Sequence, residues 1–143
     1  MTSQTKRMEV TLESIIDSVD LAEDITVRVA EAAGFGDEDR HRIGMSVREG
    51  VINAVTYGNR QNREKKVFLT LELDPGRLVI RILDQGDGFV LADVPDPLAE
   101  ENLLKSSGRG ILLMKAFMDE FDVTRGPTGG AELTLVKRMS APG

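Results

Sequence analysis

Cysteine and tryptophan are both absent from this chain, and aromatic residues make up only 4% of it. Without cysteine the chain can form no disulfide and no thiolate metal site, so the cytoplasm is the default compartment. The scarcity of aromatic rings argues against a stacking platform for nucleic-acid bases. A formal net charge of −6 argues against broad binding to phosphate backbones, which needs a basic surface. Direct nucleic-acid binding is therefore not expected, and any anionic ligand must be held by local donors or by a metal.

Long apolar segments are also missing. No run approaches the roughly 18 apolar residues that a membrane-spanning helix needs, and the first ten residues, MTSQTKRMEV, lack the apolar centre of a signal peptide. We therefore expect no membrane association. The 143 residues fit a single domain, 1–143, with one core that we expect to extend over about residues 8–138.

Apolar spacing predicts a mixture of strands and helices. Helices are expected at 15–33, with Ser14 as N-cap and Gly34 after the end, at 37–58, and from 111 onward. Strands are expected at 8–13, 67–73, 78–83, 121–124 and 131–137. A segment at about 89–107, rich in glycine, proline and acidic residues, has the length of a functional lid. This order predicts an α+β two-layer sandwich, with helices on one face of a mixed, mostly antiparallel sheet. The strand at 8–13 is expected at the sheet edge, where it offers a contact for a possible homodimer.

The helix at 37–58 carries two polar residues on an otherwise apolar stripe. Glu49 and Asn53 are four residues apart, so their side chains lie one above the other on a shared helical face. Asparagine is a poor helix former, and a carboxylate that faces the interior is costly unless it is paired. The pair offers only oxygen ligands to a cation, which suits magnesium and not zinc. The alternative is a solvated glutamate paired with lysine or arginine, and an asparagine satisfied within the core.

Two glycine motifs follow this helix. The first, Asp84-Gln85-Gly86-Asp87-Gly88, comes directly after a predicted strand, and its glycines allow a flat ligand to approach the main chain. Asp84 offers a carboxylate that accepts a hydrogen bond from an amino group, although a plain acidic turn has the same composition. The second, Gly108-Arg109-Gly110, opens a helix, where free amides, the helix dipole and a guanidinium favour an anion. The G-x-x-x-x-G-K-[ST] phosphate loop is absent, so a nucleotide would need another architecture.

In this order, E-x-x-x-N on a helix, D-x-G-x-G after a strand and G-x-G at a helix start resemble the motifs of the GHKL ATPase superfamily, which has the Bergerat ATP-binding fold. The stretches EGVINAVTYGN and GRGILLMKAFMDEF are most similar to the RsbW-type anti-sigma-factor serine/threonine protein kinases of bacteria. The resemblance implies a cytoplasmic enzyme that uses ATP, sequesters a sigma factor and phosphorylates a small anti-anti-sigma protein of the STAS type.

The resemblance also implies roles for individual residues. Asn53 would coordinate a Mg²⁺ ion that bridges the phosphates of ATP, and Glu49 would be the general base for the attacking hydroxyl. Asp84 would accept the amino group of adenine. The other implied nucleotide contacts come from the two glycine motifs: Gly86, Gly88, Gly108, Arg109 and Gly110.

Three residues depart from the family pattern. Tyr57 stands in place of a common histidine, Ser106 in place of an arginine, and Ala131 in place of a threonine. These departures leave open an alternative function, namely an ATP-binding switch protein that captures partners with little or no phosphate transfer. A detached histidine-kinase catalytic domain ranks lower, because no upstream dimerisation helix with a phosphoacceptor histidine is apparent.

Overall fold

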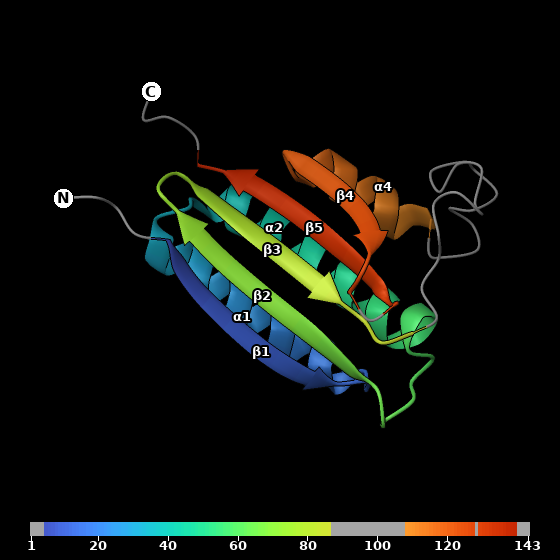
Figure 1. Cartoon of the computed structure of the whole chain (residues 1–143). Helices are drawn as coiled ribbons and strands as arrows, with labels where there is room; N and C mark the ends of the chain where they lie inside the picture. Colours follow the sequence, from blue (N-terminus) through green and yellow to red (C-terminus); the bar gives the residue numbers. More distant parts are fainter. Residues whose placement is uncertain (1–4, 87–107, 128, 140–143) are drawn as a thin grey trace.

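The computed structural model describes residues 5–86, 108–127 and 129–139. The helices among them are α1 (Asp17–Ala33), α2 (Asp37–Ile52), the short π-helix η1 (Asn53–Gly58) and α4 (Gly108–Phe117). The strands are β1 (Lys6–Glu13), β2 (Lys66–Asp74), β3 (Arg77–Leu83), β4 (Glu120–Arg125) and β5 (Ala131–Arg138) (Figure 1). The lid expected at about 89–107 lies outside the described residues. None of the described helices has the length and apolar character that crossing a membrane requires.

The strands form a single sheet in the order β1-β2-β3-β5-β4, and each neighbouring pair of these described strands is antiparallel. The helices lie together behind one face of this sheet (Figure 1). The predicted α+β two-layer sandwich is therefore confirmed, and its mostly antiparallel sheet has only antiparallel pairings in the described part. Strand β1 is at one edge, as its alternating pattern predicted.

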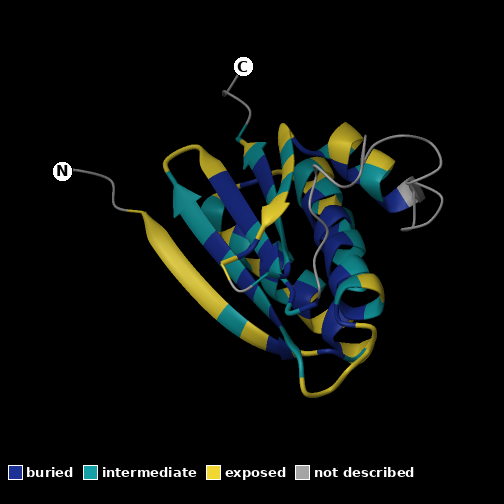
Figure 2. Cartoon of the chain, turned by 45° about the vertical axis from the view of Figure 1, so that its right-hand side comes forward, coloured by how far each residue is buried: buried dark blue, intermediate teal, exposed yellow. Residues whose placement is uncertain are grey.

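The core fills the space between the helices and the sheet (Figure 2). The period-two pattern of β2 directs Val67, Leu69 and Leu71 toward the helices, where each is almost fully buried. Helix α2 packs closely on the sheet at Gly50. A Cβ at this position would collide with the side chains of Ile82 and Leu133, so the close approach requires glycine. Removing one such apolar side chain from water contributes about 1.5–3 kcal/mol, so this interface dominates the stability of the fold.

The first helix ends as predicted but begins differently. Gly34 adopts a left-handed conformation with φ of 103° and caps the end of α1. The prediction of Ser14 as the N-cap is wrong, because α1 begins at Asp17 with no side-chain cap. Ser14 is instead fully buried, and its hydroxyl donates to the carbonyl oxygen of Lys65 at 2.6 Å. It therefore ties the β1–α1 connection to the residue before β2.

The helix expected at 37–58 is continuous but changes type within its length. The α-helical turns end at Ile52, and a wider π-helical segment runs from Asn53 to Gly58. The backbone N–H of Asn59 donates to the carbonyl oxygen of Ala54 at 2.8 Å, which closes the wide turn. Single π-helical turns occur frequently at functional sites. This turn begins at Asn53, one of the two residues singled out by the sequence.

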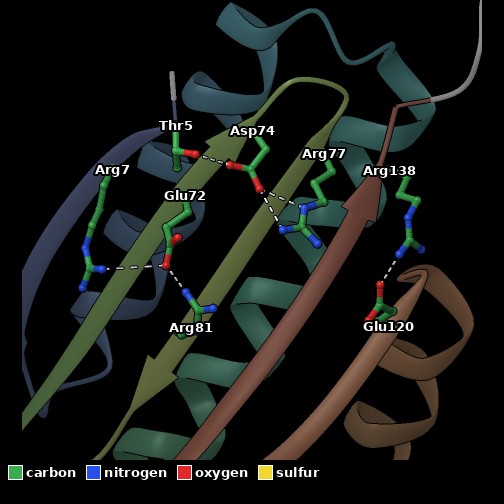
Figure 3. Close-up of polar contacts among 8 residues, drawn as sticks. All are labelled: Thr5, Arg7, Glu72, Asp74, Arg77, Arg81, Glu120 and Arg138. Carbon is green, nitrogen blue, oxygen red and sulfur yellow. Dashed lines mark hydrogen bonds and ion pairs between the residues drawn. The ribbon is translucent and has the colours of Figure 1, made fainter. Parts of the chain in front are cut away.

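The sheet face that the helices do not cover carries charged side chains that pair across strands. Figure 3 draws three groups: Arg7, Glu72 and Arg81; Thr5, Asp74 and Arg77; and Glu120 with Arg138. Exposed pairs of this kind are each worth about 0–1 kcal/mol, so they contribute little to stability. They keep this face of the sheet polar and leave the apolar packing to the helix side.

Candidate functional site

Three chain segments meet at one end of the sheet. Asp84 directly follows β3, and its N–H donates to the carbonyl oxygen of Ala131, the first residue of β5, at 3.1 Å. From the helix layer, Gly58 at the end of η1 lies against the Asp84 carboxylate. The helical segment therefore ends beside β3 and β5 (Figure 1). The end of the helical segment that carries Glu49 and Asn53 thus lies against Asp84, the residue that follows β3.

The carboxylate of Asp84 is the most constrained group of this site. Asp84 is only 5% exposed, and its Oδ1 accepts the backbone N–H groups of Gly86 at 2.9 Å and Ala131 at 3.1 Å. Burial raises the pKa of Asp84, while these two N–H groups and the charge of Lys65 oppose the rise. With Oδ1 fixed in this way, Oδ2 is the oxygen that faces Gly58.

Glycines surround Asp84 because no side chain fits at these positions. A Cβ at Gly58 would overlap the Asp84 carboxylate, and a Cβ at Gly86 would overlap the carbonyl oxygen of Gly58. A Cβ at Gly130 would meet the backbone carbonyl of Asp84. The helix end, the loop after β3 and the turn before β5 therefore pack backbone against backbone.

The Glu49 and Asn53 pair lies on the helix that leads into this contact. The Oδ1 atom of Asn53 is buried and has no hydrogen-bond partner in the described part of the chain. Glu49 is half-buried and takes part in no ion pair among those residues, whereas the adjacent Arg48 bridges Asp20 and Glu23 of α1 at 2.5 and 3.0 Å. The alternative of a paired glutamate and a satisfied asparagine is therefore not what the described residues show.

The donor set at Asn53 fits a hard cation. An amide oxygen buried without a donor is costly, and a carboxamide oxygen is a ligand type that Mg²⁺ accepts. In the described ranges, no group of three or more histidine, cysteine or acidic residues lies together so as to hold a metal by itself. An ion at Asn53 would thus take its other oxygen ligands from a bound molecule or from water, which is the usual manner of Mg²⁺ with phosphates.

The second glycine motif is described only in part. Helix α4 begins at Gly108, and Gly110 is buried at its first turn. The side chain of Arg109 and the residues Gly88 and Ser106 lie outside the described part, so their expected roles stay predictions. Tyr57 is 47% exposed at the surface of η1. Ala131 contacts Asp84 through its backbone N–H, a contact that is independent of its side chain.

Asn59, which is only 1% exposed, is a site residue that the sequence patterns above do not predict. Its side chain contacts Ser14, Lys66 and Gln85, which belong to three different segments around the site. Gly58 and Gly130, which pack on Asp84, were also missed as site residues. The available signal was the Gly58-Asn59 dipeptide, because a glycine and an asparagine directly after an apolar helix mark a chain reversal.

Comparison with known proteins identifies the class. Residues 12–137 match the histidine kinase-like ATPase domain family. This chain therefore belongs to the histidine kinase-like ATPase family, a GHKL family. Within it, the chain is similar to bacterial anti-sigma F factors.

Two of these relatives illustrate the similarity. The chain is 32% identical over 96 residues to the anti-sigma F factor of Bacillus subtilis (strain 168), an alignment that covers 66% of each protein. It is 32% identical over 105 residues to the anti-sigma F factor of Bacillus thuringiensis (strain Al Hakam), covering 72% of each.

A solved structure supports the fold. A Mycobacterium tuberculosis protein with RsbU and RsbW domains superimposes with a TM-score of 0.70, at 19% identity, over 96% of this chain and 33% of that one. At this identity the match speaks for the architecture alone.

Proposed function

We propose that this chain is an ATP-dependent serine/threonine protein kinase that acts as an anti-sigma factor and phosphorylates an anti-anti-sigma protein of the STAS type. The observation that carries the proposal is that one helical segment carries Asn53 and ends against Asp84. A buried carboxylate, Asp84, lies against the end of the same helical segment in which Asn53 has a buried and unpartnered oxygen. Membership of the ATPase family and similarity to anti-sigma F factors support it.

The base and the phosphates of ATP would be held by different parts of this site. The Oδ2 atom of Asp84 would accept a hydrogen bond from the amino group of adenine, with Gly86 and Gly88 beside the ring. Asn53 would hold a Mg²⁺ ion, which when bound neutralises phosphate charge and orients the transferred group. Arg109, between Gly108 and Gly110, would contact the phosphates from the start of α4, where a helix favours anions.

We assign Glu49 the role of general base, which removes the proton of the attacking hydroxyl group. The hydroxyl oxygen of the partner's serine or threonine would attack the γ-phosphorus while Glu49 takes the hydroxyl proton. The bond from the γ-phosphorus to the bridging oxygen breaks, and ADP leaves with that oxygen. A positioned base typically contributes about 10²–10⁴ in rate, because a serine hydroxyl is hardly ionised at neutral pH. The partial exposure of Glu49 is consistent with access from outside.

We place this activity in the cytoplasm, where a sigma factor acts, and in a single domain over 1–143. The edge of β1 that no other described strand pairs with is the contact that we propose for a homodimer.

The proposal is tested by intact-mass analysis of STAS-type candidate partners after incubation with the chain, Mg²⁺ and ATP. We expect one phosphoryl group to be added to the partner. Glu49→Ala should abolish this transfer and leave ATP affinity unchanged, whereas Glu31→Ala, at an exposed position on α1, should transfer normally. Normal transfer by Glu49→Ala would remove Glu49 from the role of base. Bound ATP together with an unchanged mass for every candidate would favour the partner-capture switch.

A further inference from the structure

Asn59 connects the helix layer to the sheet at the proposed nucleotide site. Its Nδ2 donates to Ser14 Oγ at 2.8 Å and to the carbonyl oxygen of Lys66 at 2.9 Å, and its Oδ1 accepts the backbone N–H of Gln85 at 2.7 Å. These three partners lie before α1, at the start of β2 and directly after Asp84. A side chain that is 1% exposed and makes three hydrogen bonds has a single orientation.

The backbone of Asn59 is fixed just as closely to the helix that carries Asn53. Its N–H closes the π-helical turn on Ala54 at 2.8 Å, and the N–H of Gln61 donates to Val55 at 2.7 Å. Arg60 and Gln61 then take positive φ values of 53° and 58°, which reverse the chain toward β2. Asn59 is therefore held by its backbone to the helix and by its side chain to the sheet.

The contact with Gln85 holds the loop next to Asp84 to the helix end, while the Asp84 carboxylate itself accepts the N–H groups of Gly86 and Ala131. Asp84 is the residue before Gln85, and its Oδ2 faces Gly58, the residue before Asn59. The side chain of Gln85 accepts the N–H of Lys66 at 2.6 Å, so the loop is held to β2 as well. Loss of the Asn59–Gln85 bond would free the loop from the helix end and widen the spacing between Gly58 and Asp84.

We propose that Asn59 is a positioning residue for base recognition, which holds the Asp84 carboxylate where it selects adenine over guanine. The inference rests on the proposed function, since it assumes that Asp84 meets the base of ATP. Adenine presents an amino group at its six position, which donates to a carboxylate. Guanine presents a carbonyl oxygen there, which a carboxylate repels. This selection requires a fixed carboxylate, because a mobile one turns away from the wrong base.

The alternative is that Asn59 only satisfies buried polar groups. Ser14 provides the matched control, since it is also buried and bonded to Asn59 but makes no hydrogen bond to Gln85. A merely structural role predicts that Ser14→Ala and Asn59→Ala change stability and nucleotide binding in parallel. A positioning role predicts that both variants lose stability and that only Asn59→Ala loses selectivity.

The experiment measures Kd for Mg-ATP and Mg-GTP by calorimetry on the whole chain, and compares their ratio. The ratio cancels effects on phosphate binding that both nucleotides share. We expect Asn59→Ala to lower the preference for ATP at least about tenfold, the value of one good hydrogen bond, and Ser14→Ala to keep it within about threefold. An unchanged preference in Asn59→Ala, or an equal loss in Ser14→Ala, would overturn the inference.

A second variant covers the case in which Asn59→Ala does not fold. Asn59→Asp has the same size and keeps an oxygen opposite the N–H of Gln85, but it loses the donor to both Ser14 and Lys66. It should be less stable than the wild type and keep its preference for ATP within about threefold. A loss of preference in folded Asn59→Asp would overturn the inference. A wild-type chain that binds no ATP would instead refute the proposed function.

Discussion

Asp84 and Ala131 bond to each other twice, through backbone and side chain. The N–H of Asp84 donates to the carbonyl oxygen of Ala131, and the N–H of Ala131 donates to the Asp84 carboxylate, both at 3.1 Å. The β3–β5 pairing therefore continues past the last residue of β3 and uses a side chain as its final acceptor. The register between β3 and β5 thus orients the buried carboxylate of Asp84. The geometry of the site therefore depends on correct pairing of the sheet.

The first prediction concerns the charge at this position. Asp84→Asn keeps an oxygen for the N–H groups of Gly86 and Ala131 but places an amide N–H₂ where Oδ2 meets a ligand. We expect ATP binding to fall at least about a hundredfold, because two donors then face each other. Since a buried charge is removed, the free energy of unfolding should rise by about 0.5–2 kcal/mol. Calorimetry and urea unfolding measure both changes.

Asp122→Asn, at an exposed position of β4, is the control for this substitution. It should change neither ATP affinity nor stability. Undiminished ATP binding by Asp84→Asn would remove Asp84 from the base site.

The raised pKa of Asp84 gives a pH dependence with a definite sign. The folded chain keeps a proton on Asp84 to a higher pH than the unfolded chain, whose aspartates titrate near about 3.9. The unfolded state then binds fewer protons, so the contribution of Asp84 to stability falls as pH rises from the unfolded pKa through the folded one. The stability advantage of Asp84→Asn should therefore be small near pH 4 and grow toward neutrality. Urea unfolding across this range checks it, and an advantage that shrinks with rising pH contradicts the sign.

Much of this site was predictable from the sequence, and the remainder depends on tertiary packing. Glu49 and Asn53 stand out because helical periodicity places polar groups on an apolar stripe, and Asp84 stands out because it ends a strand. The prediction of Ser14 as a helix cap is wrong because a serine before an apolar periodic segment has the same local signature whether or not it caps the helix. Its real partners, Lys65 and Asn59, lie 51 and 45 residues away. The π-helical turn likewise depends on contacts that no local pattern records.

A methyl group at Gly58 is expected to disrupt the site. The Cβ of Gly58→Ala would fall on the Asp84 carboxylate, so either the helix end or the loop must shift. We expect a loss of about 1–3 kcal/mol in the free energy of unfolding, together with weaker ATP binding. Gly36→Ala is the control, because a Cβ at Gly36 meets no atom within 4 Å and its φ of −73° suits alanine. Thermal unfolding of both variants tests the difference, and equal stabilities would show that the contact relaxes without cost.

We expect the Mg²⁺ dependence of ATP binding to require the side chain of Asn53. The buried Oδ1 of Asn53 has no partner in the described residues, so Asn53→Ala should cost little stability. It should reduce the gain in ATP affinity that Mg²⁺ provides by at least about tenfold, while affinity measured in EDTA changes little. Titrations with and without Mg²⁺ separate these two quantities. Equal magnesium dependence in variant and wild type would place the ion elsewhere.

The contact between the Gly58 backbone and the Asp84 carboxylate couples the helix layer to the sheet at this end of the fold. The Gly58 backbone and the Asp84 carboxylate are already in contact. A slide of the α2–η1 segment along the sheet must therefore change the spacing between them. A ligand that contacts both Asn53 and Asp84 would oppose that slide, because it would connect the helical segment to the sheet. Such a ligand would therefore set how easily the helix layer slides over the sheet, in addition to raising the thermal stability of the fold.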